Sequence, residues 1–333
     1  MERIRTLRAL AAAVAVCSAL TAAADAADNL AVTGRGTTII FTGTEGRIHR
    51  SIDSGLTAGP VTGGPPANVA LRGVTDAGSA FVAVGDGGAI YYSNVNGSAW
   101  NAASSGVGVT LRAVDRIGSS LVACGDGGTI IQTFNLTGTS GWQDVSVGPS
   151  VTVALNDVGR SSLLSYAVGD GGTIVQGNLL ANSFPTVIEN VPTTSDLRAF
   201  VLYATNTLIA VGEGGVILRS TDDGLTWDDL ASPTSNDLYA VAVSEGGGFA
   251  VAAGEGGVLL WSNDGLVWQV SGASPLRDDL YGADYVDGWF LLVGGTNLVA
   301  RALPASVGLE GGWDYTPVKR MTWGAVKKIY GAR

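Results

Sequence analysis

Short apolar runs alternate with glycine-rich turns along almost the whole chain, and this alternation repeats. The phrase AVGDGGAI at residues 83–90 returns in close copies that begin at Ala123, Ala167, Ala210 and Ala252, and weaker copies lie near both ends. A second phrase, an apolar stretch that begins with leucine, precedes each copy at intervals of 40 to 44 residues: Leu30, Leu71, Leu111, Leu155, Leu197, Leu238 and Leu280. Two independent phrases therefore indicate seven units.

Each unit predicts four short strands. In the third unit they cover residues 111–114, 121–124, 129–133 and 142–145, with a tight glycine turn at 125–128. A period of 40 to 45 residues with four strands per unit is typical of a propeller. We expect an all-β, seven-bladed β-propeller of four-stranded antiparallel blades over residues 27–318, with no second domain. Because the mature chain would begin just before Leu30, once a signal peptide at residues 1–26 is removed, we expect side-chain packing between the first and seventh blades to close the ring.

The first 26 residues predict a signal peptide. Three arginines precede an apolar run, and small residues follow it at Ala22, Ala24 and Ala26. The run is shorter than the roughly 20 apolar residues of a transmembrane helix. We expect a secreted protein, periplasmic or extracellular, without an integral membrane segment once the signal is removed; an uncleaved anchor is the alternative.

Composition excludes several kinds of chemistry. The net charge of −10 argues against a nucleic-acid partner, since such proteins usually present a basic field. After removal of the signal only Cys124 remains, and it stands where sister repeats carry Val84, Val168 and Val211, so we interpret it as a small buried hydrophobe. His49 is the only histidine in the chain. We therefore predict no metal site, no cofactor and no catalytic residues.

The turn between the third and fourth strands carries a second motif. Residues 220–227 read STDDGLTW, and residues 51–57 and 262–268 are shorter or altered versions, while residues 93–100 are degenerate with Val95 at the aspartate position. A carboxylate in such a turn accepts neighbouring backbone N–H groups, and the tryptophan packs beneath it. We assign these residues a structural role: Asp53, Asp222, Asp264, Trp227 and Trp268.

This combination of motifs resembles the sialidase-type Asp-box (BNR) repeat propellers, with the nearest likeness to the photosystem II assembly and stability factor-like propellers and a broader one to WD40/YVTN-type repeats. The resemblance implies a propeller fold. It leaves function open, because such families include glycosidases, assembly chaperones and sorting receptors. The arginine signature that sialidases carry before their first Asp box is not visible here. We prefer a non-catalytic protein, with a sialidase-like glycoside hydrolase or lectin as the alternative.

The face that carries the glycine turns is the candidate binding surface. Each turn begins with a carboxylate, and the residue after several of the leucines is long and polar or aromatic. The candidate binding residues are Arg72, Arg112, Arg198, Tyr239, Tyr281, Asp86, Asp126, Asp170, Glu213 and Glu255. Two interpretations stay open: a ring of ion pairs that only stabilises the fold, or a recognition surface for a protein or possibly a glycan.

Residues 319–333 form a basic tail on an otherwise acidic chain. We interpret it either as a frayed terminus or strap on the propeller, or as a docking tail. The sequence as a whole indicates an exported propeller that binds a protein partner as a scaffold or assembly factor for an envelope or extracellular complex. A purely structural, self-associating role such as a surface-layer component is a further alternative.

Overall fold

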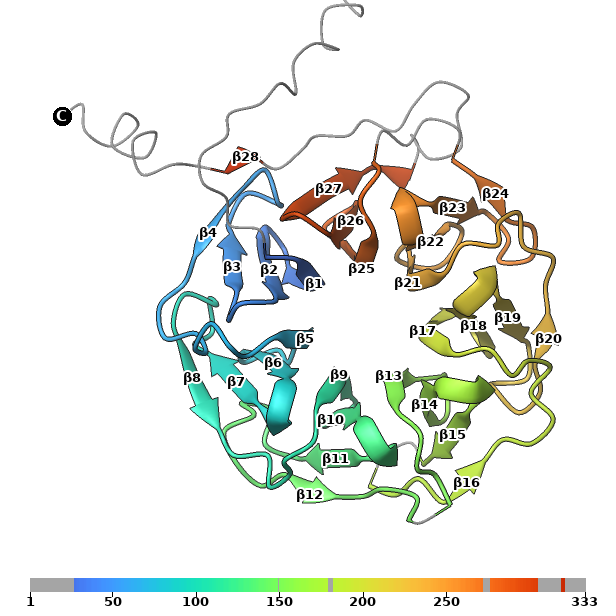
Figure 1. The fold of residues 1–333 in the computed structure, drawn as a ribbon, viewed down its shortest axis with the longest axis horizontal. Coiled ribbons are helices and arrows are strands. Elements are labelled where there is room, and N and C mark those ends of the chain that lie inside the picture. The colour runs from blue at the N-terminus through green and yellow to red at the C-terminus, as the bar shows by residue number, and fades with distance from the viewer. Residues whose placement is uncertain (1–26, 149, 179–181, 272–275, 305–318, 321–333) are drawn as a thin grey trace, which may run out of the picture.

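The chain forms a ring of seven twisted sheets around a central channel (Figure 1). This computed structural model describes residues 27–148, 150–178, 182–271, 276–304 and 319–320. The fold is a seven-bladed β-propeller with antiparallel blades, as the sequence predicts. The predicted signal peptide at 1–26 and nearly all of the basic tail lie outside the described residues.

Within each blade the strands follow one another from the channel outwards. Blade 1 contains β1 (Asn29–Arg35), β2 (Thr38–Gly43), β3 (Ile48–Ser51) and β4 (Thr57–Pro60). Blade 2 contains β5 (Leu71–Asp76), β6 (Phe81–Gly85), β7 (Ile90–Ser93) and β8 (Trp100–Ala103). Blade 3 contains β9 (Leu111–Ile117), β10 (Ser120–Gly125), β11 (Ile130–Thr133) and β12 (Gln143–Asp144).

The remaining blades repeat this order. Blade 4 contains β13 (Leu155–Arg160), β14 (Ser165–Gly169), β15 (Ile174–Gly177) and β16 (Thr186–Val187). Blade 5 contains β17 (Leu197–Ala204), β18 (Thr207–Gly212), β19 (Ile217–Ser220) and β20 (Asp228–Asp229). Blade 6 contains β21 (Leu238–Val243), β22 (Ala250–Gly254), β23 (Leu259–Ser262) and β24 (Gln269–Val270). Blade 7 contains β25 (Leu280–Val286), β26 (Trp289–Gly294) and β27 (Leu298–Ala302).

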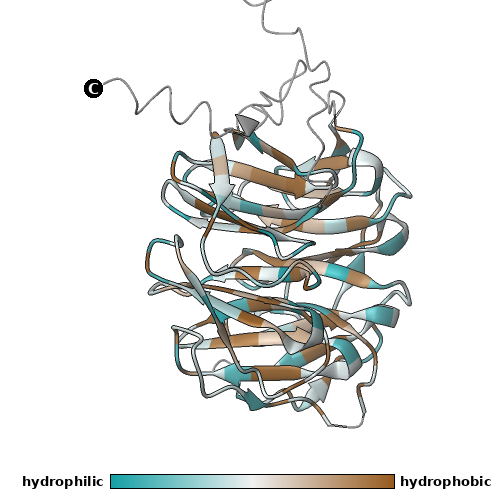
Figure 2. Cartoon of the chain, turned by 60° about the vertical axis from the view of Figure 1, so that its left-hand side comes forward, coloured by the Kyte–Doolittle hydropathy of each residue, from teal (hydrophilic) through white to brown (hydrophobic). Residues whose placement is uncertain are grey.

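The second strand of each blade is the centre of the core. All five residues of β6 are buried, and the same holds for β14 and β22. A strand that is covered on both faces reads as a continuous apolar run rather than an alternation, which explains the AVG phrases of the sequence. Figure 2 shows brown, hydrophobic bands on the strands of successive blades. The clusters of buried residues span neighbouring blades, so packing between blades holds the ring together.

The glycine turns between second and third strands are short 3₁₀ turns, of which η2 (Asp126–Gly128) is representative. Gly127 and Gly128 adopt φ angles of 67° and 73°, which L-residues rarely adopt. A Cβ atom on Gly128 would lie 2.2 Å from the carbonyl oxygen of Val151, so this position also lacks space for a side chain. The turn therefore requires the GG pair that recurs in the sequence.

All four strands of the third unit differ in extent from the prediction, and β10 extends one residue further at each end. β9 continues to Ile117, beyond the predicted end, whereas β12 has only two residues and β11 starts one residue late. β9 is longer because it pairs along its whole length with β10. β12 is short because its outer edge faces solvent and both of its residues are exposed.

The seam between blades 1 and 7 consists of packed side chains. Val32, Ile39 and Phe41 of blade 1 share one buried cluster with Val286 and Leu291 of blade 7. Asn297 accepts hydrogen bonds from Asn29 and Arg47 across the same seam. In the described part of the chain no hydrogen-bonded strand pair joins the two blades; there, side chains make the contact between them.

The outer rim near this seam also carries β28 (Lys319–Arg320), which pairs in parallel with β4 and becomes a fifth strand of blade 1 (Figure 1). Within the described ranges, no helix is long and apolar enough to cross a membrane.

Candidate functional site

The innermost strand of each blade lines the central channel, and the residue after its leucine lies at the channel mouth. We define the mouth residues as the side chains at this position in blades 2 to 7: Arg72, Arg112, Asn156, Arg198, Tyr239 and Tyr281. All six line one cavity of about 180 Å³, together with Leu30 and Ala31 of blade 1. Leu30 is the equivalent residue there, because Asn29 pairs with Gly43 as Leu71 pairs with Gly85. The preceding leucines are fully buried, so the fold fixes where each mouth side chain emerges.

Ion pairs hold the three mouth arginines in place. Arg72 Nε lies 2.7 Å from Asp86 Oδ1, and Arg112 Nε lies 2.6 Å from Asp126 Oδ1. In both pairs the carboxylate is the first residue of the glycine turn of the same blade, so the structure contains the ion pairs that the sequence suggested. These side chains are 34–42% exposed, and such pairs contribute only about 0–1 kcal/mol each. Their main effect is to orient the guanidinium groups.

Arg198 departs from this arrangement. It pairs with Asp196 at 3.0 Å and with Asp170 of the preceding blade at 3.6 Å. Asn156 also donates to Asp170, at 2.8 Å. The turn carboxylates of blades 5 and 6, Glu213 and Glu255, make no ion pair within the described residues.

The two mouth tyrosines, in the adjacent blades 6 and 7, form a pair. The centroids of Tyr239 and Tyr281 lie 5.7 Å apart with an interplanar angle of 33°, and the Tyr281 hydroxyl donates to Asp279 at 3.3 Å. Burial and the nearby carboxylates of Asp279 and Asp28 raise the pKa of Tyr281 to about 12, and burial with Asp237 and Asp279 also raises the pKa of Tyr239. Both hydroxyls therefore stay protonated and remain hydrogen-bond donors at neutral pH.

A set of carboxylates that the sequence patterns did not indicate joins consecutive blades at the mouth. Asp196, Asp237 and Asp279 each stand immediately before a strand leucine. Each accepts a backbone N–H from the glycine turn of the preceding blade, at 2.8–2.9 Å, from Gly171, Gly214 and Gly256 respectively. The recurrence of aspartate before leucine in three successive repeats was the available signal.

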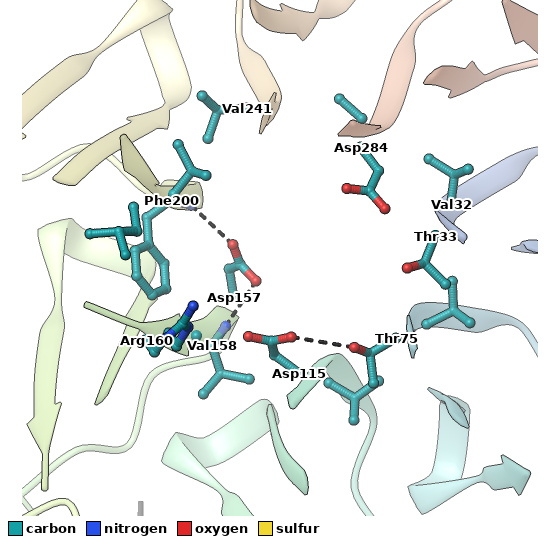
Figure 3. Close-up of a pocket in the computed structure, with 16 residues that line it drawn as sticks. Val32, Thr33, Thr75, Asp115, Asp157, Val158, Arg160, Phe200, Val241 and Asp284 are labelled. Carbon is teal, nitrogen blue, oxygen red and sulfur yellow. Dashed lines mark hydrogen bonds between the residues drawn. The ribbon is translucent and has the colours of Figure 1, made fainter. Parts of the chain in front are cut away.

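Three further carboxylates lie deeper in the channel and were also missed. Asp115, Asp157 and Asp284, here called the channel carboxylates, line a cavity of about 390 Å³ (Figure 3). Asp115 and Asp284 occupy the same position of their units, four residues after the strand leucine. Asp157 stands two residues after its leucine, where blades 2, 3, 5, 6 and 7 carry glycine or alanine. The recurrence of aspartate in two units and the departure from glycine or alanine in a third were the available signals.

Each channel carboxylate interacts with a neighbouring blade. Asp115 accepts from the Thr75 hydroxyl at 3.3 Å, Asp157 from the backbone N–H of Phe200 at 3.0 Å, and Asp284 is hydrogen-bonded by Thr33. Burial raises the pKa of Asp115 to about 6 and the pKa values of Asp157 and Asp284 to about 7, against the opposing effect of these hydrogen bonds. The channel therefore titrates near neutral pH.

The Asp-box residues lie in turns between the third and fourth strands. Asp222 accepts hydrogen bonds from the Ser220 hydroxyl and from the backbone and hydroxyl of Thr226, at 2.6–2.9 Å. Trp227 is 8% exposed and donates to the Gly224 carbonyl at 3.0 Å. Asp53 and Asp264 make equivalent turns, and Trp268 is likewise buried. The carboxylates of the Asp boxes therefore accept hydrogen bonds within their own turns.

In the degenerate box of blade 2 a different side chain takes this role. Val95 is exposed, and Asn94, one residue earlier, accepts the backbone N–H of Ser98 at 2.9 Å. Asn135 and Asn178 act similarly in blades 3 and 4. An asparagine one or two residues after the third strand therefore substitutes for the box aspartate in blades 2 to 4.

Groups that suit metal or thiol chemistry are sparse in the described part of the chain. No cluster of three or more His, Cys, Asp or Glu side chains with a geometry for metal binding occurs there. Cys124 is fully buried, its thiol lies 3.5 Å from the Leu155 carbonyl, and burial raises its pKa well above the usual value.

The fold and this mouth define a seven-bladed propeller whose channel opens through a ring of arginine, asparagine and tyrosine side chains. No family model matches the chain, and no curated protein matches it. Among solved structures, YCF48 bound to a D1 peptide is 19% identical with a TM-score of 0.67, and the match covers 84% of this chain and 92% of that chain. YCF48 from Cyanidioschyzon merolae is 16% identical with a TM-score of 0.68, covering 84% and 97%.

The WD40 β-propeller domain of Doa1 is similar to the same extent, with 12% identity, a TM-score of 0.66 and coverage of 84% and 93%. Similarity at these identities supports the resemblance to photosystem II assembly factor propellers and to WD40 propellers at the level of the fold. The sialidase part of the resemblance finds no support in these structures.

Proposed function

We propose that this chain is a non-catalytic exported propeller that binds a segment of a protein partner at the channel mouth, as a scaffold or assembly factor for an envelope or extracellular complex. The observation that carries the proposal is the mouth itself. Six consecutive blades place an arginine, asparagine or tyrosine around one cavity. Arginine and tyrosine are the residues that most often anchor protein interfaces.

The mouth offers two kinds of contact. The arginines of blades 2, 3 and 5 are already oriented by carboxylates, so they present charged donors to a partner with little loss of side-chain freedom. The tyrosines of blades 6 and 7 add apolar surface and hydroxyl donors at low entropic cost. A peptide segment with acidic and apolar groups would use both sides. The YCF48 structure with a D1 peptide offers a precedent for peptide binding by this fold.

Export and an envelope location rest on the amino-terminal sequence. Arg3, Arg5 and Arg8 precede the apolar run of the predicted signal. Cell fractionation with amino-terminal sequencing of the recovered protein tests this part: a processed chain that begins near residue 27 outside the cytoplasm supports it. Recovery of the intact chain in the cytoplasm would overturn it.

Binding is tested by affinity capture from envelope extract with three baits. They are the unaltered chain, the variant R72A/R112A/R198A, and the control R116A. Arg116 lies on β9, the strand that also carries Arg112, but it is exposed and makes no contact with the mouth cavity.

We expect one defined protein to be captured by the unaltered chain and by R116A, and lost from the triple variant. Thermal unfolding of all three baits separates lost contact from lost fold, and Y239A/Y281A provides a second test of the mouth. Retention by both mouth variants would place the binding surface elsewhere. Hydrolysis of chromogenic glycosides by the unaltered chain would overturn the non-catalytic part of the proposal.

A further inference from the structure

Blade 6 has the longest loop between its first and second strands. Residues 244–249, which read SEGGGF, separate β21 from β22, whereas two to four residues form this loop in the other blades. Its three consecutive glycines all adopt positive φ angles. A Cβ atom on Gly246 or Gly248 would meet no atom of the described chain within 4 Å beyond its chain neighbours. The loop therefore leaves open space beside the end of β21.

A groove of about 560 Å³ lies next to this loop, and it is named here the blade 6 groove. It is lined by the ends of β17, β21 and β25, which are neighbours around the channel (Figure 1), and by the loops that follow these strands. The first strand of each blade begins at the mouth, so it ends on the opposite face of the ring, which also carries the Asp boxes. The groove shares no lining residue with the mouth cavity, and it shares Leu202 with the cavity of the channel carboxylates.

Two tyrosines form the aromatic wall of the groove. Tyr203 of β17 is buried, and its ring lies so close to Gly265 that a Cβ atom there would approach the ring carbons to 3.0–3.1 Å. Tyr285 of β25 packs edge-to-face on Phe290, with ring centroids 4.9 Å apart. Both rings are held by packing, so the wall has its shape before a ligand binds.

Two carboxylates at the rim give the groove its charge. Glu245 belongs to the long loop of blade 6 and Asp287 to the tight turn between β25 and β26, and both are exposed. Asp287 accepts a hydrogen bond from the Ser54 hydroxyl at 3.1 Å. Within the described chain Glu245 has no hydrogen bond, and neither carboxylate forms an ion pair. Their negative charges are therefore available to a ligand.

The lining of the groove contains no basic side chain to balance these charges. Arg301 donates to the Ser54 carbonyl at 3.0 Å, but it is 9% exposed and does not line the groove. A surface with two carboxylates and no cation attracts a positively charged partner and disfavours an acidic one.

Exposed apolar side chains lie beside the groove in blade 6. Gly265, which contacts the Tyr203 ring, belongs to the Asp box of this blade. The next two residues of the box, Leu266 and Val267, are both exposed. The turn thus presents apolar surface next to the aromatic wall.

The Asp box of blade 1 does the same on the other side. Ser54, which donates to Asp287, lies in this box between Ile52 and Leu56, and both of these apolar residues are exposed. Exposed apolar side chains that gather around one site mark an interaction surface.

Charge and lining together indicate the occupant. Aromatic rings and carboxylates both stabilise a cationic group, and the two Asp boxes offer contacts to apolar neighbours of that group. We infer that the blade 6 groove binds a segment of a protein partner that carries lysine or arginine between apolar residues. This goes beyond the proposed binding at the mouth and does not depend on it. The propeller would then hold two segments of opposite charge, one on each face.

Peptide binding to the full chain tests the inference. The probe is a short fluorescein-labelled peptide of alternating leucine and lysine, and binding is measured by anisotropy at about 0.15 M salt. The test variant is E245Q/D287N. Asparagine readily adopts the φ angle of 52° found at Asp287, so the turn is kept. The matched control is D228N/D229N on β20, where both residues are exposed and the net charge changes by the same amount.

We expect saturable binding to the unaltered chain and to the control, and binding weakened roughly five-fold in E245Q/D287N, as loss of two exposed ion pairs implies. L266S/V267S should also weaken binding, because it removes apolar contacts while both carboxylates stay. The mouth variant R72A/R112A/R198A should bind like the unaltered chain. Absence of saturable binding, equal weakening in both carboxylate variants, or loss in the mouth variant alone overturns the inference.

Cross-linking on the unaltered chain locates the peptide without any variant. A carbodiimide activates carboxylates, and the amine of a bound lysine then forms an amide with the carboxylate beside it. We expect peptide mass mapping to find the probe on Glu245 or Asp287. Linkage to the mouth carboxylates Asp86 and Asp126 instead contradicts the inference.

Discussion

The Asp157 carboxylate in β13 accepts a 3.0 Å hydrogen bond from the backbone N–H of Phe200 in β17, in the next blade. The carboxylate thus joins two blades from inside the channel, where burial raises its pKa to about 7. In an unfolded chain an aspartate titrates near 3.9. Between these pH values the folded state binds more protons than the unfolded state, so the free energy of unfolding falls as pH rises through this window.

This gives the first prediction, on the pH dependence of stability. The free energy of unfolding should be higher at pH 5 than at pH 8, by at least about 1 kcal/mol, since one pKa unit corresponds to about 1.4 kcal/mol. D157N keeps an oxygen acceptor for Phe200 and removes the titration, so it should reduce this difference. Urea unfolding at pH 5, 6.5 and 8 measures it. D228N, on the exposed strand β20, is the control, and its free energy of unfolding should depend on pH as that of the parent does. The same pH dependence in D157N would contradict the assignment to Asp157.

The second prediction concerns the Asp boxes. D222A removes an acceptor of three hydrogen bonds in the turn before Trp227. Loss of hydrogen bonds to a charged group should lower the free energy of unfolding by about 1–3 kcal/mol. V95A alters the corresponding position of blade 2, where Asn94 holds the turn, and should change it by less than about 0.5 kcal/mol. Equal effects in chemical denaturation would refute the assigned role of Asp222.

The third prediction separates the two glycines of one turn. Both Gly127 and Gly128 have positive φ, but only Gly128 faces a carbonyl oxygen at a distance that excludes a Cβ atom. G127A should cost about 1 kcal/mol for its backbone conformation. G128A should cost clearly more, of the order of 3 kcal/mol or a loss of soluble protein, because strain and overlap add. Thermal unfolding of both variants is the measurement, and a reversed order would show that the turn can shift.

The fourth prediction is that Cys124 does not react while the chain is folded. Its thiol is fully buried and its pKa is raised by burial, so the reactive thiolate is scarce at pH 8. A chromogenic thiol reagent should label Cys124 only as denaturant unfolds the chain. The midpoint of labelling should equal the midpoint of unfolding measured by fluorescence. C124V, which introduces the residue of the sister repeats, should unfold within about 1.5 kcal/mol of the parent. Rapid labelling in buffer would contradict this burial.

Sequence reasoning succeeded where the repeats agree with one another. Leu71 and Leu111 occupy the same position of successive units and are buried at the same place in successive blades. The same equivalence brings Arg72 and Arg112 to one cavity, because residues in matching register on every inner strand lie at one level of the channel.

It failed where a single blade departs from its sisters. Asp157 is an isolated substitution two residues after its strand leucine. Its place in one cavity with Asp115 and Asp284, which share another position of their units, depends on the circular arrangement of the blades. Arg198 pairs with Asp196 and with the turn of the preceding blade instead of its own Glu213, because the distance between two blades cannot be obtained from one repeat. The substitution of Asn94 for a box aspartate is likewise a matter of turn geometry.

The division of labour between neighbouring residues in the innermost strands has one further consequence. In blades 2 to 7 the buried leucine supports the fold, and the next residue emerges at the channel mouth. Arginine, asparagine and tyrosine all occur at this position on the same backbone. A single substitution at this position can therefore change the side chain that one blade presents at the mouth, without changing the strands that support it.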